Sequence, residues 1–174
     1  MKKLLALVLI LIVFCVSITS VIPVKAHWPR VLDVGVGGQP FLTLTEALAD
    51  ALPGDVIHVW NNPIPYMENP VINVSNIKII GQSLAGVTIN PAVPGYCFAI
   101  LAPGVTIMGL TIEDTFMTPT GVGIYIAPSS MQCKIWDNVI LNFDIGIVID
   151  NSPNNEVIGN EISGCMVTPS PPPG

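Results

Sequence analysis

The chain has 174 residues, the length of one domain, and only 10% of them are charged. Three of its six lysines and arginines lie before residue 26, so the rest of the chain sets three strong bases against twelve acids, a formal charge of −9. An acidic chain without a basic patch is a poor ligand for nucleic acid, and it should also repel polyanions unless a cation intervenes.

The N-terminus has the pattern of an export signal. Lys2-Lys3 precedes an apolar and small run over residues 4–18, and Val24-Lys25-Ala26 resembles a cleavage site. We predict a signal peptide over residues 1–26, cleavage after Ala26 and a secreted, periplasmic or cell-surface protein without membrane association. A retained membrane anchor is the alternative, but the run is shorter than the roughly 20 residues that a spanning helix needs.

Export permits disulfides among the three remaining cysteines, which are Cys97, Cys133 and Cys165. Their number is odd and no C-x-x-C motif is present, so we favour buried, unpaired cysteines, although the disulfide state stays open. His27 and His58 are not spaced with the cysteines as a zinc ligand set. An N-terminal His27 binding copper would need a second histidine nearby, and we do not favour it.

Short strands are predicted over residues 31–34 and 55–60, with a helix between them. Thr43 followed by Glu46 has the form of a capping box, so the helix should cover about residues 43–52. Pro53-Gly54 would end it.

The predicted helix carries Leu44, Leu48 and Leu52 on one face. A solenoid exposes strand edge and core at its open end, which therefore needs a lid. We expect this leucine face to cap the first coil by packing on Val56, Ile57 or their neighbours.

The second half of the chain repeats. The segment 123–129 recurs as the segment 146–152, and the segment 135–140 recurs as the segment 157–162. Looser copies of the second segment begin at Ile107 and at Ile79. Short β-branched runs bounded by Gly, Asn and Pro, with a period in the twenties, predict a parallel β-helix of about four rungs over residues 27–165.

Alternation within each strand predicts three inward stacks along the solenoid. They are Ile124 with Ile147 and Ile126 with Ile149; Ile107, Ile135 and Val157; and Ile112, Ile140 and Ile162. Asn138 and Asn160 fall at one corner, where Asn tolerates a left-handed backbone and can form a side-chain ladder.

The first half carries a more specific pattern. LTEALADALPGDVIHVW followed by YMENPVINVSNIKIIG resembles the opening of the pectin-lyase-like right-handed parallel β-helix superfamily. The matching residues are Glu46, Ala47, Leu48, Pro53, Gly54, Asp55, Ile57, Val59, Tyr66, Glu68, Asn69, Ile72, Val74, Ile77, Ile79 and Gly81. Residues 105–164 resemble the β-helix repeats of NosD-type periplasmic copper-maturation proteins and of exported surface proteins.

The resemblance implies an all-β, right-handed parallel β-helix with a short N-terminal capping helix. It says little about activity, because the superfamily contains lyases, hydrolases, esterases and plain binding proteins. The copper chemistry of NosD-type proteins finds no support, since Met67, Met108, Met117 and Met131 are scattered and form no cluster with histidine.

In enzymes of this superfamily the substrate cleft runs along the outer face of the first strand of each coil. By alternation, we expect Asp144, Gly146, Val148 and Asp150 to point outward on one rung, with Gly121, Gly123, Tyr125 and Ala127 on the rung before. Asp144 and Asp150 would stand roughly 20 Å apart along the strand. Acid–base pairs that cleave glycosides need about 5–10 Å, so we predict no catalytic residues.

Two weaker sites remain near this face. Glu113, Asp114, Asn142 and Asp144 carry oxygens that can hold calcium, although solvated turn residues are the interpretation we favour. Apart from this possible calcium ion, no cofactor is expected.

The second weak site is a carbohydrate-binding surface. Phe116 and Tyr125 offer rings that can stack on a sugar, with Asp144 and Asp150 beside them.

Residues 166–174 are rich in Pro and read as an extended tail or linker. No cap is visible after the last coil, so the strand edge above Ile162 is predicted to meet further chain, the folded-over tail or a second copy edge to edge.

We therefore predict a non-catalytic surface or periplasmic module that binds polysaccharide or cell-envelope glycan. The alternative is the N-terminal part of a polysaccharide-active enzyme, of the pectate or pectin lyase, pectinesterase or glycoside hydrolase kind, whose catalytic rungs lie outside this chain. A purely structural repeat of a cell-envelope protein is the third possibility.

Overall fold

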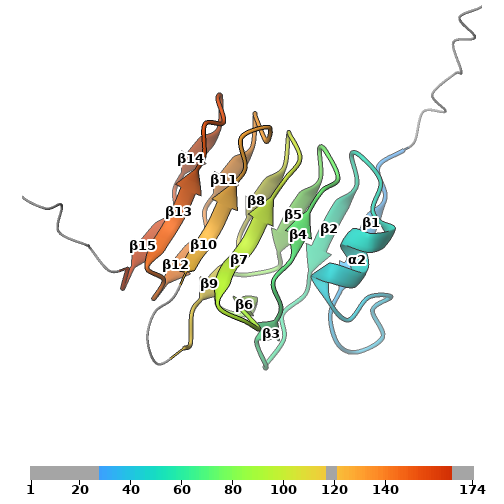
Figure 1. Cartoon of the computed structure of the whole chain (residues 1–174). Helices are drawn as coiled ribbons and strands as arrows, with labels where there is room; N and C mark the ends of the chain where they lie inside the picture. The colour runs from blue at the N-terminus through green and yellow to red at the C-terminus, as the bar shows by residue number, and fades with distance from the viewer. Residues whose placement is uncertain (1–27, 117–120, 166–174) are drawn as a thin grey trace, which may run out of the picture.

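The computed structural model describes residues 28–116 and 121–165, which form a right-handed parallel β-helix (Figure 1). Every pair of neighbouring strands is parallel, and the chain passes through three sheets in turn on each coil. The predicted signal peptide and the predicted tail lie outside the described residues.

We name the sheets A, B and C. Sheet A contains β1 (Val31–Val34), β2 (Val56–Val59), β5 (Lys78–Gly81), β8 (Thr106–Met108), β11 (Lys134–Trp136) and β14 (Glu156–Ile158). Sheet B contains β3 (Tyr66–Met67), β6 (Thr88–Asn90), β9 (Thr111–Glu113), β12 (Val139–Leu141) and β15 (Glu161–Ser163). Sheet C contains β4 (Val71–Ile72), β7 (Gly95–Ile100), β10 (Gly121–Ile126) and β13 (Ile145–Ile149). The solenoid is thus about one coil taller than the sequence predicts.

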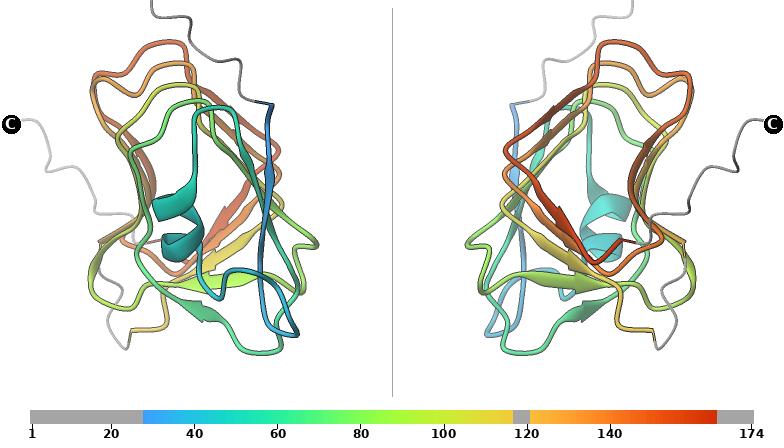
Figure 2. Two further views of the ribbon diagram at one scale, coloured as in Figure 1. Left: turned by 90° about the vertical axis from the view of Figure 1, so that its right-hand side faces the viewer. Right: turned by 90° about the vertical axis from the view of Figure 1, so that its left-hand side faces the viewer.

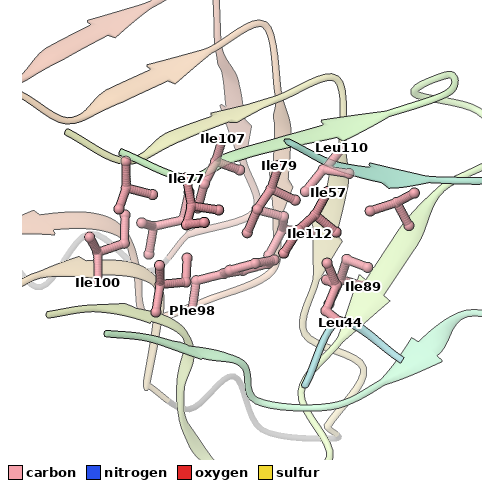
Figure 3. Close-up of a cluster of buried hydrophobic side chains, with 14 of the residues drawn as sticks. Leu44, Ile57, Ile77, Ile79, Ile89, Phe98, Ile100, Ile107, Leu110 and Ile112 are labelled. Atoms are coloured by element: carbon pink, nitrogen blue, oxygen red, sulfur yellow. The ribbon is translucent and has the colours of Figure 1, made fainter. Parts of the chain in front are cut away.

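The predicted stacks are confirmed by the strand register. Ile107, Ile135 and Val157 are aligned on sheet A, and the stack extends down to Ile79 and Ile57. Ile112, Ile140 and Ile162 are aligned on sheet B, and Ile124 and Ile147 on sheet C. The buried members of these stacks belong to one hydrophobic core, part of which is shown in Figure 3. Each fully buried isoleucine contributes roughly 1.5–3 kcal/mol.

The last described coil is less covered than the others. Val157 is 41% exposed and Ile162 is 44% exposed, although both continue stacks that are fully buried in the preceding coils. No described coil lies above β14 and β15, so these side chains form the open end of the core.

Helix α2 (Leu44–Asp50) lies across the other end of the solenoid (Figures 1 and 2). The capping box of Thr43 and Glu46 is present, and Leu44 and Leu48 are buried as predicted. The predicted place of Leu52 is wrong, because the helix ends at Asp50 and Leu52 is 45% exposed. Ala51 already has extended backbone angles, which turn the following residue away from the core.

Glu68 joins this helix to the first coil. Its carboxylate accepts hydrogen bonds from the backbone amides of Leu44 and Thr45, both at 2.9 Å, and from the Thr45 hydroxyl at 2.7 Å. A negative charge at a helix N-terminus satisfies amides that have no partner within the helix. Glu68 therefore holds the lid on the first coil.

The corner between sheets A and B carries the predicted asparagine ladder. The Asn138 amide group donates to the Asn160 side-chain oxygen at 3.0 Å, and the Asn138 oxygen accepts from the Leu110 amide at 3.1 Å. The left-handed backbone does not fall on these asparagines. It falls on the preceding residues, with φ of 72° at Gly109, 50° at Asp137 and 69° at Gly159.

The three described cysteines are unpaired, with Cys97 and Cys133 buried and Cys165 partly exposed. Burial raises the pKa of the Cys97 and Cys133 thiols above their ordinary value.

Among the residues that the structure describes, no helix is long and apolar enough to cross a membrane.

Candidate functional site

The outer face of sheet C carries a pair of stacked tyrosines. Tyr96 on β7 and Tyr125 on β10 have ring centroids 4.4 Å apart and ring planes 13° from parallel. Tyr96 is 47% exposed, and Tyr125 is half-buried. The two rings therefore form an aromatic surface that spans two neighbouring coils.

Asp150 completes this surface at the end of β13. Its carboxylate accepts a hydrogen bond from the Tyr125 hydroxyl at 2.9 Å and another from the Asn151 side chain at 2.9 Å. The hydrogen bond to the Asp150 carboxylate raises the pKa of Tyr125 above its ordinary value. We define the tyrosine face as Tyr96, Tyr125 and Asp150.

Asn69 fixes the turn that leads into Tyr96. Its side-chain nitrogen donates to the Tyr96 carbonyl at 2.8 Å, and its oxygen accepts from the amides of Ala92 and Val93. The tyrosine is therefore held by a residue from the preceding coil.

Glycine sets the distance between the strands beside the tyrosine face. Gly121 has a φ of 88°, and a Cβ at this position would collide with the Gly95 carbonyl. The close approach of these two backbones starts β7 and β10 in register.

The predicted outward positions are correct for Tyr125 and wrong for Gly123 and Gly146. A Cβ on Gly123 would meet the buried side chains of Ile140 and Phe143, and one on Gly146 would meet Ile162. Both glycines therefore face the core.

The structure brings together only two of the four predicted sugar-binding residues, Tyr125 and Asp150. Asp144 lies at the opposite end of β13 and accepts a hydrogen bond from the Gly121 amide at 3.2 Å. Phe116 is half-buried, and its amide donates to Asp114 at 2.8 Å. The rest of its predicted loop, residues 117–120, lies outside the described part of the chain.

The oxygens proposed for calcium bind protein groups. Glu113 accepts from the Asn142 side chain at 3.3 Å, whereas Asp114 and Asp144 bond to backbone amides. Within residues 28–116 and 121–165, no three His, Cys, Asp or Glu side chains are grouped as metal ligands. The calcium site stays a prediction.

Sequence reasoning missed Tyr96. The segment 95–100 pairs in register with the segment 121–126, but this register places Tyr96 opposite Val122 and Ala99 opposite Tyr125. The two tyrosine rings meet through their side chains, so aligning the segments does not predict the stack.

The sequence matches no family model and no curated protein. Solved structures do match its fold. A pectin methylesterase variant in complex with a hexasaccharide aligns with a TM-score of 0.68 and 19% identity over 79% of this chain and 49% of that chain. Another complex of a pectin methylesterase with a hexasaccharide gives a TM-score of 0.59 and 19% identity over 70% of this chain and 46% of that chain.

The pectin methylesterase PemA from Erwinia chrysanthemi gives a TM-score of 0.57 at 19% identity, over 80% of this chain and 49% of that chain. This chain thus spans about half the length of these enzymes. Identity at this level is evidence of a shared fold only. Together with the coil architecture, it shows that the chain shares the right-handed parallel β-helix fold of these pectin methylesterases, which is the fold that the resemblance of its opening motif implies.

Proposed function

We propose that the protein is an exported, non-catalytic β-helix module that binds an uncharged polysaccharide on the tyrosine face. The observation that carries the proposal is the stacked pair of Tyr96 and Tyr125, which stands exposed on sheet C with the Tyr125 hydroxyl tied to Asp150.

The chemistry of this face suits a sugar. An exposed tyrosine ring offers an apolar surface for the C–H face of a pyranose, and it costs little side-chain entropy to order. The two phenol groups and the Asp150 carboxylate can bond sugar hydroxyls. The two rings stack on each other at 4.4 Å, so a sugar unit that packs against the exposed side of the pair contacts two neighbouring coils.

Charge favours an uncharged ligand at this face. The sequences of β4, β7, β10 and β13 contain no lysine or arginine, while Asp144 and Asp150 stand at the two ends of β13. A neutral or fully esterified sugar chain avoids repulsion by these carboxylates.

Two arguments favour binding over hydrolysis. Asp144 and Asp150 flank a strand of 5 residues and cannot act as one acid–base pair. Each of them already accepts a hydrogen bond from the protein. The similar pectin methylesterases are about twice as long as this chain. The alternative to a binding module is therefore an enzyme of which this chain supplies only a part.

A calorimetric titration with neutral hexasaccharides, including fully methyl-esterified hexagalacturonate, tests the proposal. We expect at least one of them to bind, and Tyr96→Ala or Tyr125→Ala to weaken it roughly tenfold or more, since burying a large aromatic side chain contributes about 1.5–3 kcal/mol. Trp28→Ala is the matched control, because Trp28 is an exposed ring remote in sequence from the tyrosine face.

Turnover is measured on the same samples. Release of methanol, or of unsaturated uronides, would contradict a non-catalytic role and support the enzymatic alternative. A panel without binding would leave the structural-repeat interpretation as the better account.

A further inference from the structure

A second surface, on the outer face of sheet A, has a different chemistry from the tyrosine face. It is a groove of about 680 Å³ that crosses β5, β8, β11 and β14. Two rows of side chains line it, and both follow the strand register. Lys78, Thr106, Lys134 and Glu156 form the first row, and Ile80, Met108, Trp136 and Ile158 are aligned in the second, of which the first three line the groove. We call this surface the lysine groove.

The positive charges of the described chain are concentrated here. Of the three strong bases that follow residue 26, Arg30 is bonded to Asp50 and Asp55 near the N-terminal lid. The other two, Lys78 and Lys134, both line the groove. The charge of −9 on the chain after residue 26 therefore hides a local excess of positive charge.

The two lysines differ in their contacts with neighbouring side chains. Within the described residues no ion pair forms with Lys78, which is exposed. The Lys134 ammonium lies 3.9 Å from a Glu156 oxygen and 4.5 Å from the centre of the Trp136 ring. Glu156 is the one acid that lines the groove, so the two lysines leave a net charge of +1.

Spacing indicates the shape of the ligand. Lys78 and Lys134 occupy the same register position two strands apart, which places their Cα atoms about 10 Å from each other along the solenoid axis. The apolar row lies two residues further along each strand, at about 7 Å. A matching ligand is a linear chain that turns an apolar side to Met108 and Trp136 and repeated anionic groups to the lysines.

Trp136 offers a further contact. Its indole nitrogen is buried and has no hydrogen-bond partner among the described residues. An unpaired buried N–H is costly, so a ligand oxygen that reached it after a side-chain rearrangement in the groove would be favoured.

We propose that the lysine groove binds a carboxylate-bearing oligosaccharide, with Lys78 and Lys134 pairing with its carboxylates and Trp136 stacking on a sugar ring. Lysine–carboxylate pairs supply charge-assisted bonds, and the indole supplies the apolar surface that a pyranose ring covers. A nucleic acid fits less well, because its continuous phosphates require more cations than two. The groove shares no residue with the tyrosine face, so the two proposals stand or fall separately.

The test compares de-esterified hexagalacturonate with its fully methyl-esterified form by calorimetry at low ionic strength, on the chain from His27 onward, which contains the whole described solenoid. We expect the acid form to bind and the double variant Lys78→Gln, Lys134→Gln to weaken it roughly tenfold or more. Glu156→Gln should tighten binding, since it removes the one carboxylate among the described residues that line the groove. Tyr125→Ala should leave binding of the acid form unchanged.

The variants must keep the circular dichroism spectrum and the melting temperature of the parent chain. We expect them to do so, because the replaced side chains reach the surface. Equal binding of the acid form by the parent and the double lysine variant would overturn the proposal, as would the absence of measurable binding. Equal affinity for polyglutamate would show a general anion site and would also overturn it. Loss of esterified-sugar binding in Tyr125→Ala alone concerns the tyrosine face and does not bear on the groove.

Discussion

The Tyr125 hydroxyl donates a hydrogen bond of 2.9 Å to the carboxylate of Asp150, which lies one coil further along the solenoid. The contact raises the pKa of Tyr125 above its ordinary value of 10.0. Because the folded chain holds this proton more tightly than the unfolded chain, the contribution to stability is complete below pH 10. It is lost as the pH rises through the folded-state pKa.

We therefore expect Asp150→Asn to lower the pKa of Tyr125 towards 10.0, since asparagine keeps an acceptor but loses the negative charge. The titration is followed by NMR of ring-labelled tyrosine. Tyr66 is the internal control, because burial is the main cause of its raised pKa and Asp150 does not contribute to it. An unchanged Tyr125 titration in the variant would contradict the hydrogen bond.

Glu68→Ala should destabilise the lid. The change removes three hydrogen bonds from the N-terminus of α2 and leaves the buried Leu44 amide without its partner. We expect a loss of about 2–3 kcal/mol in the free energy of unfolding, measured by urea denaturation. Glu161→Ala, at an exposed position of β15, is the matched control and should change it by less than about 0.5 kcal/mol. Equal losses would contradict the capping role.

Asn138→Ala should destabilise the corner between sheets A and B. Asn138 is almost fully buried and bonds the Leu110 amide, the Ile107 carbonyl and the Asn160 side chain. Leaving the first two groups unpaired should cost about 2–4 kcal/mol. Asn160→Ala, at the more exposed next step of the ladder, should cost less. The order of the two losses is the test, and its reversal would argue against a ladder anchored in the core.

Thiol labelling separates the cysteines. Burial raises the pKa of Cys97 and Cys133 and shields both side chains, whereas Cys165 is partly exposed. In the chain from His27 onward we expect one thiol to react quickly with Ellman's reagent and two more only after unfolding. Cys165→Ser should abolish the fast phase, and a fast phase that survives this change would show that the solenoid opens readily.

Much of the fold could be predicted because a solenoid repeats its local rules. Glycine, asparagine and β-branched residues recur at corresponding positions of successive coils, and the resulting stacks, such as Ile107 on Ile135, need no knowledge of distant contacts. Even residues of the opening motif prove structural, since Glu68 caps α2 and Asn69 holds the turn before Tyr96.

The candidate sites were harder to predict for two physical reasons. Strict alternation fails at Gly123 and Gly146, which turn inward where a larger residue would collide with the core. Net charge also averages over the chain, so it concealed Lys78 and Lys134, which share one position of the repeat on coils that are far apart in the sequence. Comparing the coils position by position would have revealed this lysine pair but not Tyr96, which stands opposite Val122 in the strand register.

The measurement that tests the central claim most directly is NMR of the labelled rings of Tyr96 and Tyr125 during titration with a neutral hexasaccharide. If the tyrosine face binds the sugar, both ring signals shift with one saturating curve, and the Tyr66 signal, from a buried ring, stays in place. Saturable binding in calorimetry without any shift of Tyr96 and Tyr125 would place the ligand elsewhere and contradict the account.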